Sequence, residues 1–326
     1  MAQRHLDRLS AVDVAFLTQE GPNTHMHIGG VCVFEGPPPD YDALSRHIAS
    51  RLHLVPRYRH KIVEPRLEAG RPLWVDDPTF NIGYHVRHTA LPAPGGDEEL
   101  MALTARIFSQ RLDRAKPLWE LWLVERIDED RFALISKVHH SLVDGVSGAD
   151  LMTVLFDLDA EARELEPEPW VPHREPTSAE LVAAGAGGLV RTAAGLAAGA
   201  ASLATHPGAV ARRAREALGG VGEIVALTAS APPPTPFNVP IGPYRRTADL
   251  QADLAHFKEI KDALGGTVND VVLAVVGGAL RQWMLDRGEP VDGVTLRVCV
   301  PVSVRTEAQR GALGNELTQM IAPLPL

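Results

Sequence analysis

The residues from His139 to Gly145 read HHSLVDG and could carry out acid–base chemistry. A neutral imidazole can take a proton from a hydroxyl or thiol near neutral pH, because its unperturbed pKa is about 6.5. A carboxylate, Asp144, follows both histidines within the same short stretch. Gly145 suits a backbone with positive φ or the close approach of a substrate. The pattern therefore predicts a general base with an acidic group nearby.

The residue types alone leave the roles of His139, His140 and Asp144 open. Neighbouring residues of a strand face opposite sides, so only one histidine can point to a given face. Asp144 either orients the imidazole, as in a serine hydrolase triad, or pairs with an arginine and holds the shape of the loop. Metal ligation and a purely structural loop are the alternatives. We expect no metal, because the sequence offers no second cluster of matching ligands.

Strands and helices must position this loop. The apolar run 131–138 predicts a buried strand that ends at the histidines, and the alternating run 118–125 predicts its hairpin partner through a turn at 128–130. A further strand is predicted over 27–34. Helices are expected over 41–52, over 100–112 and after the loop, where Ser147 and Asp150 have capping spacing. The Pro117-Leu118-Trp119 stretch is expected to pack in the core.

Composition divides the chain into three segments. Residues 1–165 form an N-terminal domain that carries HHSLVDG, residues 166–243 a Pro-rich and Ala/Gly-rich helical crossover linker, and residues 244–326 the first part of a second domain. In the last segment, Thr267 and Asp270 predict a capping box for a helix over 267–283. Its expected inner face is made of Val271, Val275, Leu280 and Trp283. A strand is predicted over 295–304, with Pro301 at an edge or bulge.

The overall composition is that of a globular protein, with 45% hydrophobic and 22% charged residues and a net charge of −9. No basic stripe is present, so nucleic-acid binding is not expected. The N-terminus lacks the apolar segment of a signal peptide, and no run of 18 uncharged apolar residues occurs, so a cytoplasmic location is expected. Cys32 and Cys299 are expected to be buried free thiols.

Several blocks besides HHSLVDG point to a known family. They are LSAVDVAFL followed by HMHIGG, then PLWELWLVE, NDVVLAVVGGALR, and VPVSVR with a later GNELT. Together they resemble the bacterial wax ester synthase/diacylglycerol acyltransferases. This family lies within the HHxxxDG superfamily of chloramphenicol acetyltransferases, condensation domains and plant BAHD acyltransferases. The blocks run through essentially the whole chain in the family's order.

The resemblance implies an α/β (α+β) protein with the two-domain chloramphenicol-acetyltransferase-like fold, in which helices flank mixed sheets. It implies transfer of a fatty acyl group from acyl-CoA to diacylglycerol or a long-chain alcohol, with no cofactor and no metal. His140 is then the general base and His139 a supporting neighbour, while Asp144 pairs with Arg305 beside Gly145. Asn269 is then expected to shape the tunnel or to support the oxyanion, with capping of its helix as the alternative.

Family members usually continue beyond residue 326, so the second domain is expected to be incomplete, with a separate C-terminal fragment as the candidate to complete it. Peripheral association with the inner face of the membrane or with lipid droplets fits the apolar products. Two other functions stay open. One is acyl transfer to another hydroxyl, such as that of a polyketide or glycolipid, and the other is lipid binding without turnover.

Overall fold

The computed structural model places much of the chain in two compact units. The described residues are 7–64, 71–128, 130–143, 156–157, 165–166, 168–177, 180–181, 233–303 and 317–326. The first unit holds the described residues up to 181 together with 241–248, and the second holds 233–240, 249–303 and 317–326. The predicted boundaries at 165 and 243 stay a prediction, because most of the segment between them lies outside the described residues.

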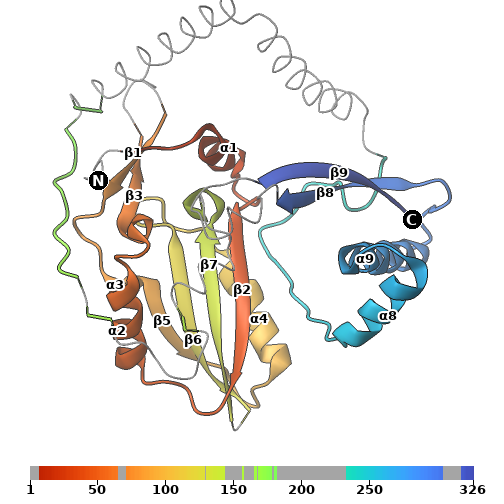
Figure 1. The fold of residues 1–326 in the computed structure, drawn as a ribbon, viewed down its shortest axis with the longest axis horizontal. Helices are drawn as coiled ribbons and strands as arrows, with labels where there is room; N and C mark the ends of the chain where they lie inside the picture. The colour runs from red at the N-terminus through yellow and green to blue at the C-terminus, as the bar shows by residue number, and fades with distance from the viewer. Residues whose placement is uncertain are drawn as a thin grey trace, which may run out of the picture. The chain divides into compact units, whose positions relative to one another are not determined.

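A four-stranded mixed sheet forms the centre of the first unit (Figure 1). Its strands lie in the order β2 (His27–Glu35), β7 (Arg131–His139), β6 (Trp119–Ile127) and β5 (Val86–Ala90). β2 and β6 are antiparallel to β7, whereas β5 runs parallel to β6. The predicted β6–β7 hairpin is confirmed. The ladder shifts register between Val124 and Ile127, and Asp128 takes a positive φ of 59° at the turn.

Two hydrophobic cores lie on opposite faces of this sheet, because alternate residues of β6 and β7 point to opposite sides. One core joins the sheet to α1 (Ala11–Gln19) and α2 (Tyr41–Arg51), and the other joins it to α4 (Asp97–Ser109). The first includes Leu121, Leu123, Leu134 and Val138, and the second includes Val124, Ala133 and Ile135. Trp119 is fully buried in the first core, as expected for this stretch.

Helix α4 begins three residues earlier than the pattern predicted. Gly96 precedes it with a φ of 120°, which an L side chain rarely adopts, so the helix begins at Asp97. Three acidic residues, Asp97, Glu98 and Glu99, fill its first turn, where the positive end of the helix dipole favours negative charge.

A smaller antiparallel sheet completes the first unit in the order β1 (Asp7–Arg8), β4 (Leu73–Asp76) and β3 (His60–Val63). The 3-10 turn η1 (Pro56–Arg59) leads directly into β3, whereas the short helix α3 (Ile82–His85) contacts β5 and β6 of the four-stranded sheet. The helix expected after the histidine loop lies outside the described residues.

The second unit contains α8 (Leu254–Leu264), α9 (Val268–Leu285) and an antiparallel pair, β8 (Thr295–Ser303) and β9 (Leu317–Pro325). The predicted capping box is present, since Thr267 and Asp270 each bond the other's backbone amide.

Pro301 lies in a two-stranded ladder, where each strand has a free edge among the described residues. No single described helix is long and apolar enough to span a bilayer, whereas α8 and α9, bent by 100°, pass that test as a pair.

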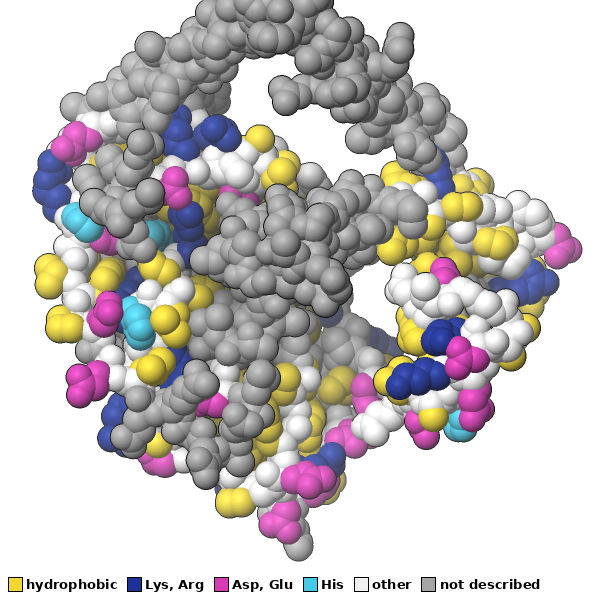
Figure 2. Space-filling view, in the orientation of Figure 1, with side chains coloured by type: hydrophobic (Ala, Val, Ile, Leu, Met, Phe, Trp, Pro, Cys, Tyr) yellow, Lys and Arg dark blue, Asp and Glu magenta, His cyan; other side chains and the backbone are white. Residues whose placement is uncertain are grey.

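Two burial predictions are wrong. On α9, Val271 is buried and Leu280 half-buried, but Val275 and Trp283 are exposed. Other apolar side chains of this unit, such as Leu264 and Val272, are exposed as well, and hydrophobic atoms are visible over its surface (Figure 2). Cys32 and Cys299 are free thiols, yet Cys32 is half-buried and Cys299 exposed, and among the described residues each lies on an outer strand of its sheet.

Candidate active site

The two histidines lie at the junction between β7 and a 3-10 turn, η3 (His140–Val143). The strand ends with the amide of His139 donating to the carbonyl of Leu118, 2.9 Å away. The next amide, that of His140, donates to Met26 at 2.8 Å, which ties the turn to the residue before β2. β7 therefore ends at His139, and His140 belongs to the turn, so the alternation of strand side chains does not determine where His140 points.

His139 is enclosed, with 1% of its surface exposed. Its Nδ1 lies 2.7 Å from the hydroxyl of Ser141 and accepts the backbone N–H of the same residue at 3.1 Å. A backbone amide can only donate, so Nδ1 carries no proton and the neutral ring is protonated at Nε2. Burial lowers the pKa of His139 to about 4, and the nearby Arg114 acts in the same direction while Glu20 opposes it. His139 is therefore a neutral, fixed side chain at pH 7.

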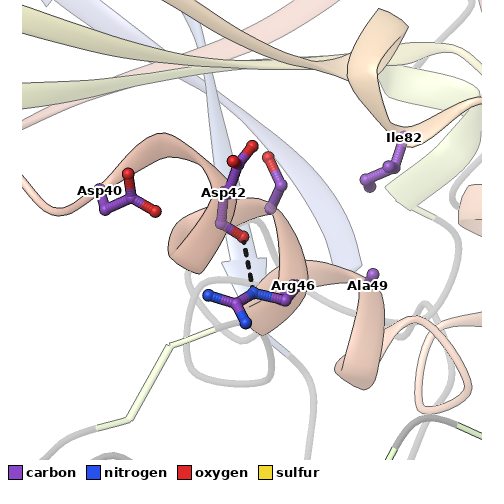
Figure 3. Close-up of a pocket in the computed structure, with 6 residues that line it drawn as sticks. Asp40, Asp42, Arg46, Ala49 and Ile82 are labelled. Atoms are coloured by element: carbon purple, nitrogen blue, oxygen red, sulfur yellow. Dashed lines mark hydrogen bonds between the residues drawn. The ribbon is translucent and has the colours of Figure 1, made fainter.

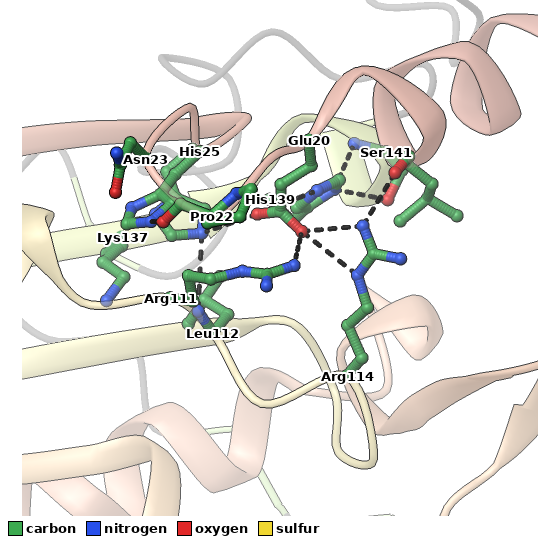
Figure 4. Close-up of polar contacts among 12 residues, drawn as sticks. Glu20, Pro22, Asn23, His25, Arg111, Leu112, Arg114, Lys137, His139 and Ser141 are labelled. Atoms are coloured by element: carbon green, nitrogen blue, oxygen red, sulfur yellow. Dashed lines mark hydrogen bonds and ion pairs between the residues drawn. The ribbon is translucent and has the colours of Figure 1, made fainter. Parts of the chain in front are cut away.

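Glu20 is the buried carboxylate closest to this ring (Figure 4). Its side chain is 2% exposed, and its Oε2 accepts hydrogen bonds from Arg114 at 2.7 Å and Arg111 at 3.1 Å. Oε1 lies 3.9 Å from Nε2 of His139. Burial raises the pKa of Glu20, but the two arginines outweigh it and hold the pKa below the usual value. The carboxylate is therefore charged.

His27 extends the same cluster from β2. Its Nε2 lies 3.5 Å from Oε1 of Glu20 and 3.4 Å from the amide nitrogen of Leu112. Burial lowers the pKa of His27 to about 3, and the cation of Lys137 adds to the effect. One charged carboxylate thus lies between two neutral imidazoles on neighbouring strands.

Lys137 connects this face of β7 to α4. Its side chain is fully buried, and Nζ donates to the carbonyl of Ile107 at 3.0 Å and lies 3.6 Å from Oε2 of Glu120. Burial lowers the pKa of Lys137, which the neighbouring Glu120 partly offsets. This contact anchors the end of α4 beneath the strand that carries the histidines.

His140 has a different environment from its neighbour. It is half-buried, and its ring stacks on Phe16 of α1 with centroids 3.9 Å apart and an angle of 21°. No residue in the described part of the chain forms a hydrogen bond with its ring nitrogens. An imidazole that is held on one face, with ring nitrogens that no described residue bonds, has the form that a general base needs.

The other predicted site residues are only partly placed. Asp144, Gly145 and Arg305 lie outside the described residues, so their roles stay predictions. Asn269 is exposed in the first turn of α9. It does not cap the helix, because Thr267 occupies that position, and its tunnel or oxyanion role stays a prediction.

Sequence reasoning missed Glu20, Arg111, Arg114 and Phe16. Phe16 lies within the block LSAVDVAFL, which served only for the family resemblance, and Glu20 lies between that block and Gly21-Pro22. No local pattern links Glu20 to arginines more than 90 positions later. Their meeting depends on the tertiary fold.

A pocket of about 550 Å³ lies elsewhere on the first unit, at α2 and α3 (Figure 3). Its lining residues are Asp40, Asp42, Ser45, Arg46, Ala49 and Ile82. It contains none of the predicted site residues. Asp40 accepts the Ala43 amide as the helix cap and so stabilises the start of α2, while Arg46 donates to the Asp42 carbonyl at the exposed surface of the helix. Among the described residues, no group of three or more His, Cys, Asp or Glu is arranged to hold a metal ion.

Comparison with known proteins gives the family context. A family model described as the wax ester synthase/diacylglycerol acyltransferase catalytic domain matches residues 9–272. A putative diacylglycerol O-acyltransferase of Mycobacterium tuberculosis H37Rv is 37% identical over 329 residues, covering 98% of this chain and 63% of that protein. The probable diacylglycerol O-acyltransferase tgs1 of the same strain is 32% identical, covering 98% of this chain and 67% of its own length. The chain thus spans less than two thirds of the first of these relatives.

Solved structures support the predicted fold class. A wax ester synthase/diacylglycerol acyltransferase from Marinobacter aquaeolei VT8 matches with a TM-score of 0.60 and 28% identity, covering 87% of this chain and 63% of that one. The first condensation domain of the calcium-dependent antibiotic synthetase matches with a TM-score of 0.54 and 17% identity, covering 98% and 69%. The second likeness shows the fold alone. The mixed α/β, chloramphenicol-acetyltransferase-like class is therefore confirmed.

Proposed function

The chain belongs to the wax ester synthase/diacylglycerol acyltransferase family, and we propose that it is an O-acyltransferase that uses acyl-CoA as donor. The proposed acceptor is the hydroxyl of diacylglycerol or of a long-chain alcohol. The observation that carries the proposal is the contrast between the two histidines. His139 is enclosed and bonded, while His140 is half-buried with ring nitrogens that no described residue bonds.

In the proposed reaction, His140 is the general base. It takes the proton of the acceptor hydroxyl as the oxygen attacks the thioester carbonyl, which forms the new C–O bond. The tetrahedral intermediate then collapses, the C–S bond breaks, and the imidazolium returns the proton to the departing thiolate of coenzyme A. Atoms and charges balance with no acyl-enzyme. A base of this kind accounts for roughly 10² to 10⁴ in rate.

The remaining site residues complete the proposal. Asp144 would pair with Arg305 and hold the loop through Gly145, and Asn269 would shape the acceptor tunnel or support the oxyanion. The lipid acceptor and product place the reaction at a lipid surface, so a cytoplasmic site at the inner face of the membrane or on lipid droplets is part of the proposal.

Release of coenzyme A from palmitoyl-CoA tests the function. The full chain is given dioleoylglycerol, hexadecanol or a short alcohol, and the ester product is identified by mass spectrometry. We expect His140→Ala to lose at least about 10²-fold in turnover while its melting temperature is kept. His88→Ala, a variant of an exposed histidine on β5, is the matched control and should retain activity.

The outcomes separate the alternatives. A folded His140→Ala variant with full activity would show that the proposed base is wrong. Ester formation only with an unrelated hydroxyl acceptor would change the substrate class. Binding of palmitoyl-CoA with no coenzyme A release from any acceptor would identify a lipid-binding protein.

A further inference from the structure

Helix α1 contacts both histidines of the HHSLVDG motif. Phe16 stacks on His140 with ring centroids 3.9 Å apart, and Glu20, at the C-terminal end of the same helix, lies 3.9 Å from Nε2 of His139. Phe16 lies within α1, whereas Glu20 is the residue that follows its last turn, with a ψ of 116° outside the helical range. Helix α1 and its capping residue therefore meet two adjacent side chains, one at the end of β7 and one at the start of η3.

The helix is itself firmly held. Ser10 and Asp13 form a reciprocal capping box at its start, with bonds of 3.1 and 2.9 Å, and Asp13 is buried. Leu17 is part of the first hydrophobic core. At the other end, Arg114 donates both to the carbonyl of Leu17 and to Glu20. An element fixed at both ends can hold a side chain in one orientation.

The contact with Glu20 explains the state of His139. Because Ser141 donates its backbone N–H to Nδ1, the single proton of the neutral ring must lie on Nε2. That buried Nε2 has no hydrogen-bond partner within the described residues, and Glu20 supplies a negative charge beside it. The charge favours the Nε2–H form, and this form leaves Nδ1 bare to accept from the turn that presents His140.

We propose that α1 positions the motif, with Phe16 fixing the ring plane of His140 and Glu20 fixing the protonated nitrogen of His139. The expected effect on kcat rests on the proposed function. The expected effects on the ring plane of His140 and on the protonated nitrogen of His139 do not. Phe16 and Glu20 are positioning residues, since each acts through a histidine.

The Phe16 arm of the test uses Phe16→Leu, which keeps an apolar side chain and removes the aromatic plane. Phe16→Tyr restores the plane. The matched control is Phe34→Leu, because Phe34 stacks on Phe132 at 5.0 Å and 12° at the opposite end of β2. We expect Phe16→Leu to lose roughly 10- to 100-fold in kcat with KM unchanged, Phe16→Tyr to recover most of it, and Phe34→Leu to match wild type.

The Glu20 arm uses Glu20→Gln, with Glu125→Gln as its control. Glu125 lies 2.8 Å from His88, so it is also a glutamate beside a histidine, but on β6 away from the motif. Nitrogen-15 NMR of the histidine rings reports which nitrogen is protonated. We expect an Nε2–H signal for His139 in wild type and in Glu125→Gln, and a mixture of both protonated forms in Glu20→Gln.

The NMR readout keeps this inference separate from the proposed function. If the chain transfers no acyl group, the positioning role of α1 can still be tested by the His140 ring signals in Phe16→Leu and the His139 ring signals in Glu20→Gln. Unchanged signals in both variants would overturn the proposal. The proposal would also be overturned if Phe16→Leu and Phe34→Leu lost kcat and melting temperature to the same extent, because the loss of kcat would then reflect stability alone.

Discussion

His27 and His139 are directly opposite partners in the β2–β7 ladder, with ring centroids 6.1 Å apart and an edge-on angle of 71°. Both rings approach the same carboxylate, Glu20. Two imidazoles in such an environment would repel if both were charged. The structure avoids this repulsion by burying them in the neutral form, and this arrangement makes the stability of the first unit depend on pH.

The free energy of unfolding should fall as pH decreases from about 6.5. The folded-state pKa is lowered to about 3 for His27 and to about 4 for His139 and His85, all by burial. The unfolded chain therefore binds protons first, and each histidine lowers stability by roughly 1.4 kcal/mol per pH unit between its two pKa values. Their contribution is complete above pH 6.5 and is lost down to about pH 4 for His139 and His85 and to about pH 3 for His27.

Urea denaturation at pH 7.5, 6 and 5 checks this pH dependence. In His85→Gln the free energy of unfolding should fall less steeply with decreasing pH, by the slope that one titrating histidine contributes. His256→Gln, at an exposed position of α8, should leave the slope unchanged. Equal slopes for wild type and His85→Gln would contradict the expectation.

Gly29 and Gly30, adjacent on β2, should differ sharply in their tolerance of a methyl group. A Cβ on Gly29 would lie 2.2 Å from the ring of Phe108, whereas a Cβ on Gly30 would meet its nearest neighbour, the hydroxyl of Ser136, at 3.5 Å. We expect Gly29→Ala to destabilise the protein by about 1–3 kcal/mol, because the Phe108 ring must move. Gly30→Ala should be close to neutral. Thermal denaturation of the two variants checks this, and similar melting temperatures would refute it.

Breaking the ion pair between Arg51 and Asp157 should be strongly destabilising, because the remaining charge would be left largely buried without its partner. Arg51 is buried on α2, and its Nη2 lies 2.6 Å from Oδ2 of Asp157, which follows the motif loop. Arg51→Met removes one partner of a largely buried pair and should cost about 3–5 kcal/mol. Arg46→Met, at an exposed position of the same helix, is the control and should stay within about 0.5 kcal/mol of wild type. Equal denaturation midpoints for the two variants would show that the pair is not needed.

Sequence patterns predicted the structure correctly where it depends on residues that are close together along the chain. The β6–β7 hairpin followed from an alternating run and an apolar run joined by a short acidic turn. The Thr267–Asp270 capping box formed because both its bonds span three residues. Burial on α9 was predicted less well. An apolar stripe gives a periodicity, but whether Val275 and Trp283 are covered depends on what packs against the helix.

The sequence by itself determined the family and the strand that ends at HHSLVDG, and it named the two histidines as candidate reactive groups. Only the tertiary structure decided how those histidines differ. His139 is neutral and fixed because Glu20, Arg111 and Arg114 meet beside it from distant parts of the chain. His140 is held on one face by Phe16 because α1 packs against the turn. Burial and long-range charge set a protonation state, and neither can be read from residue spacing.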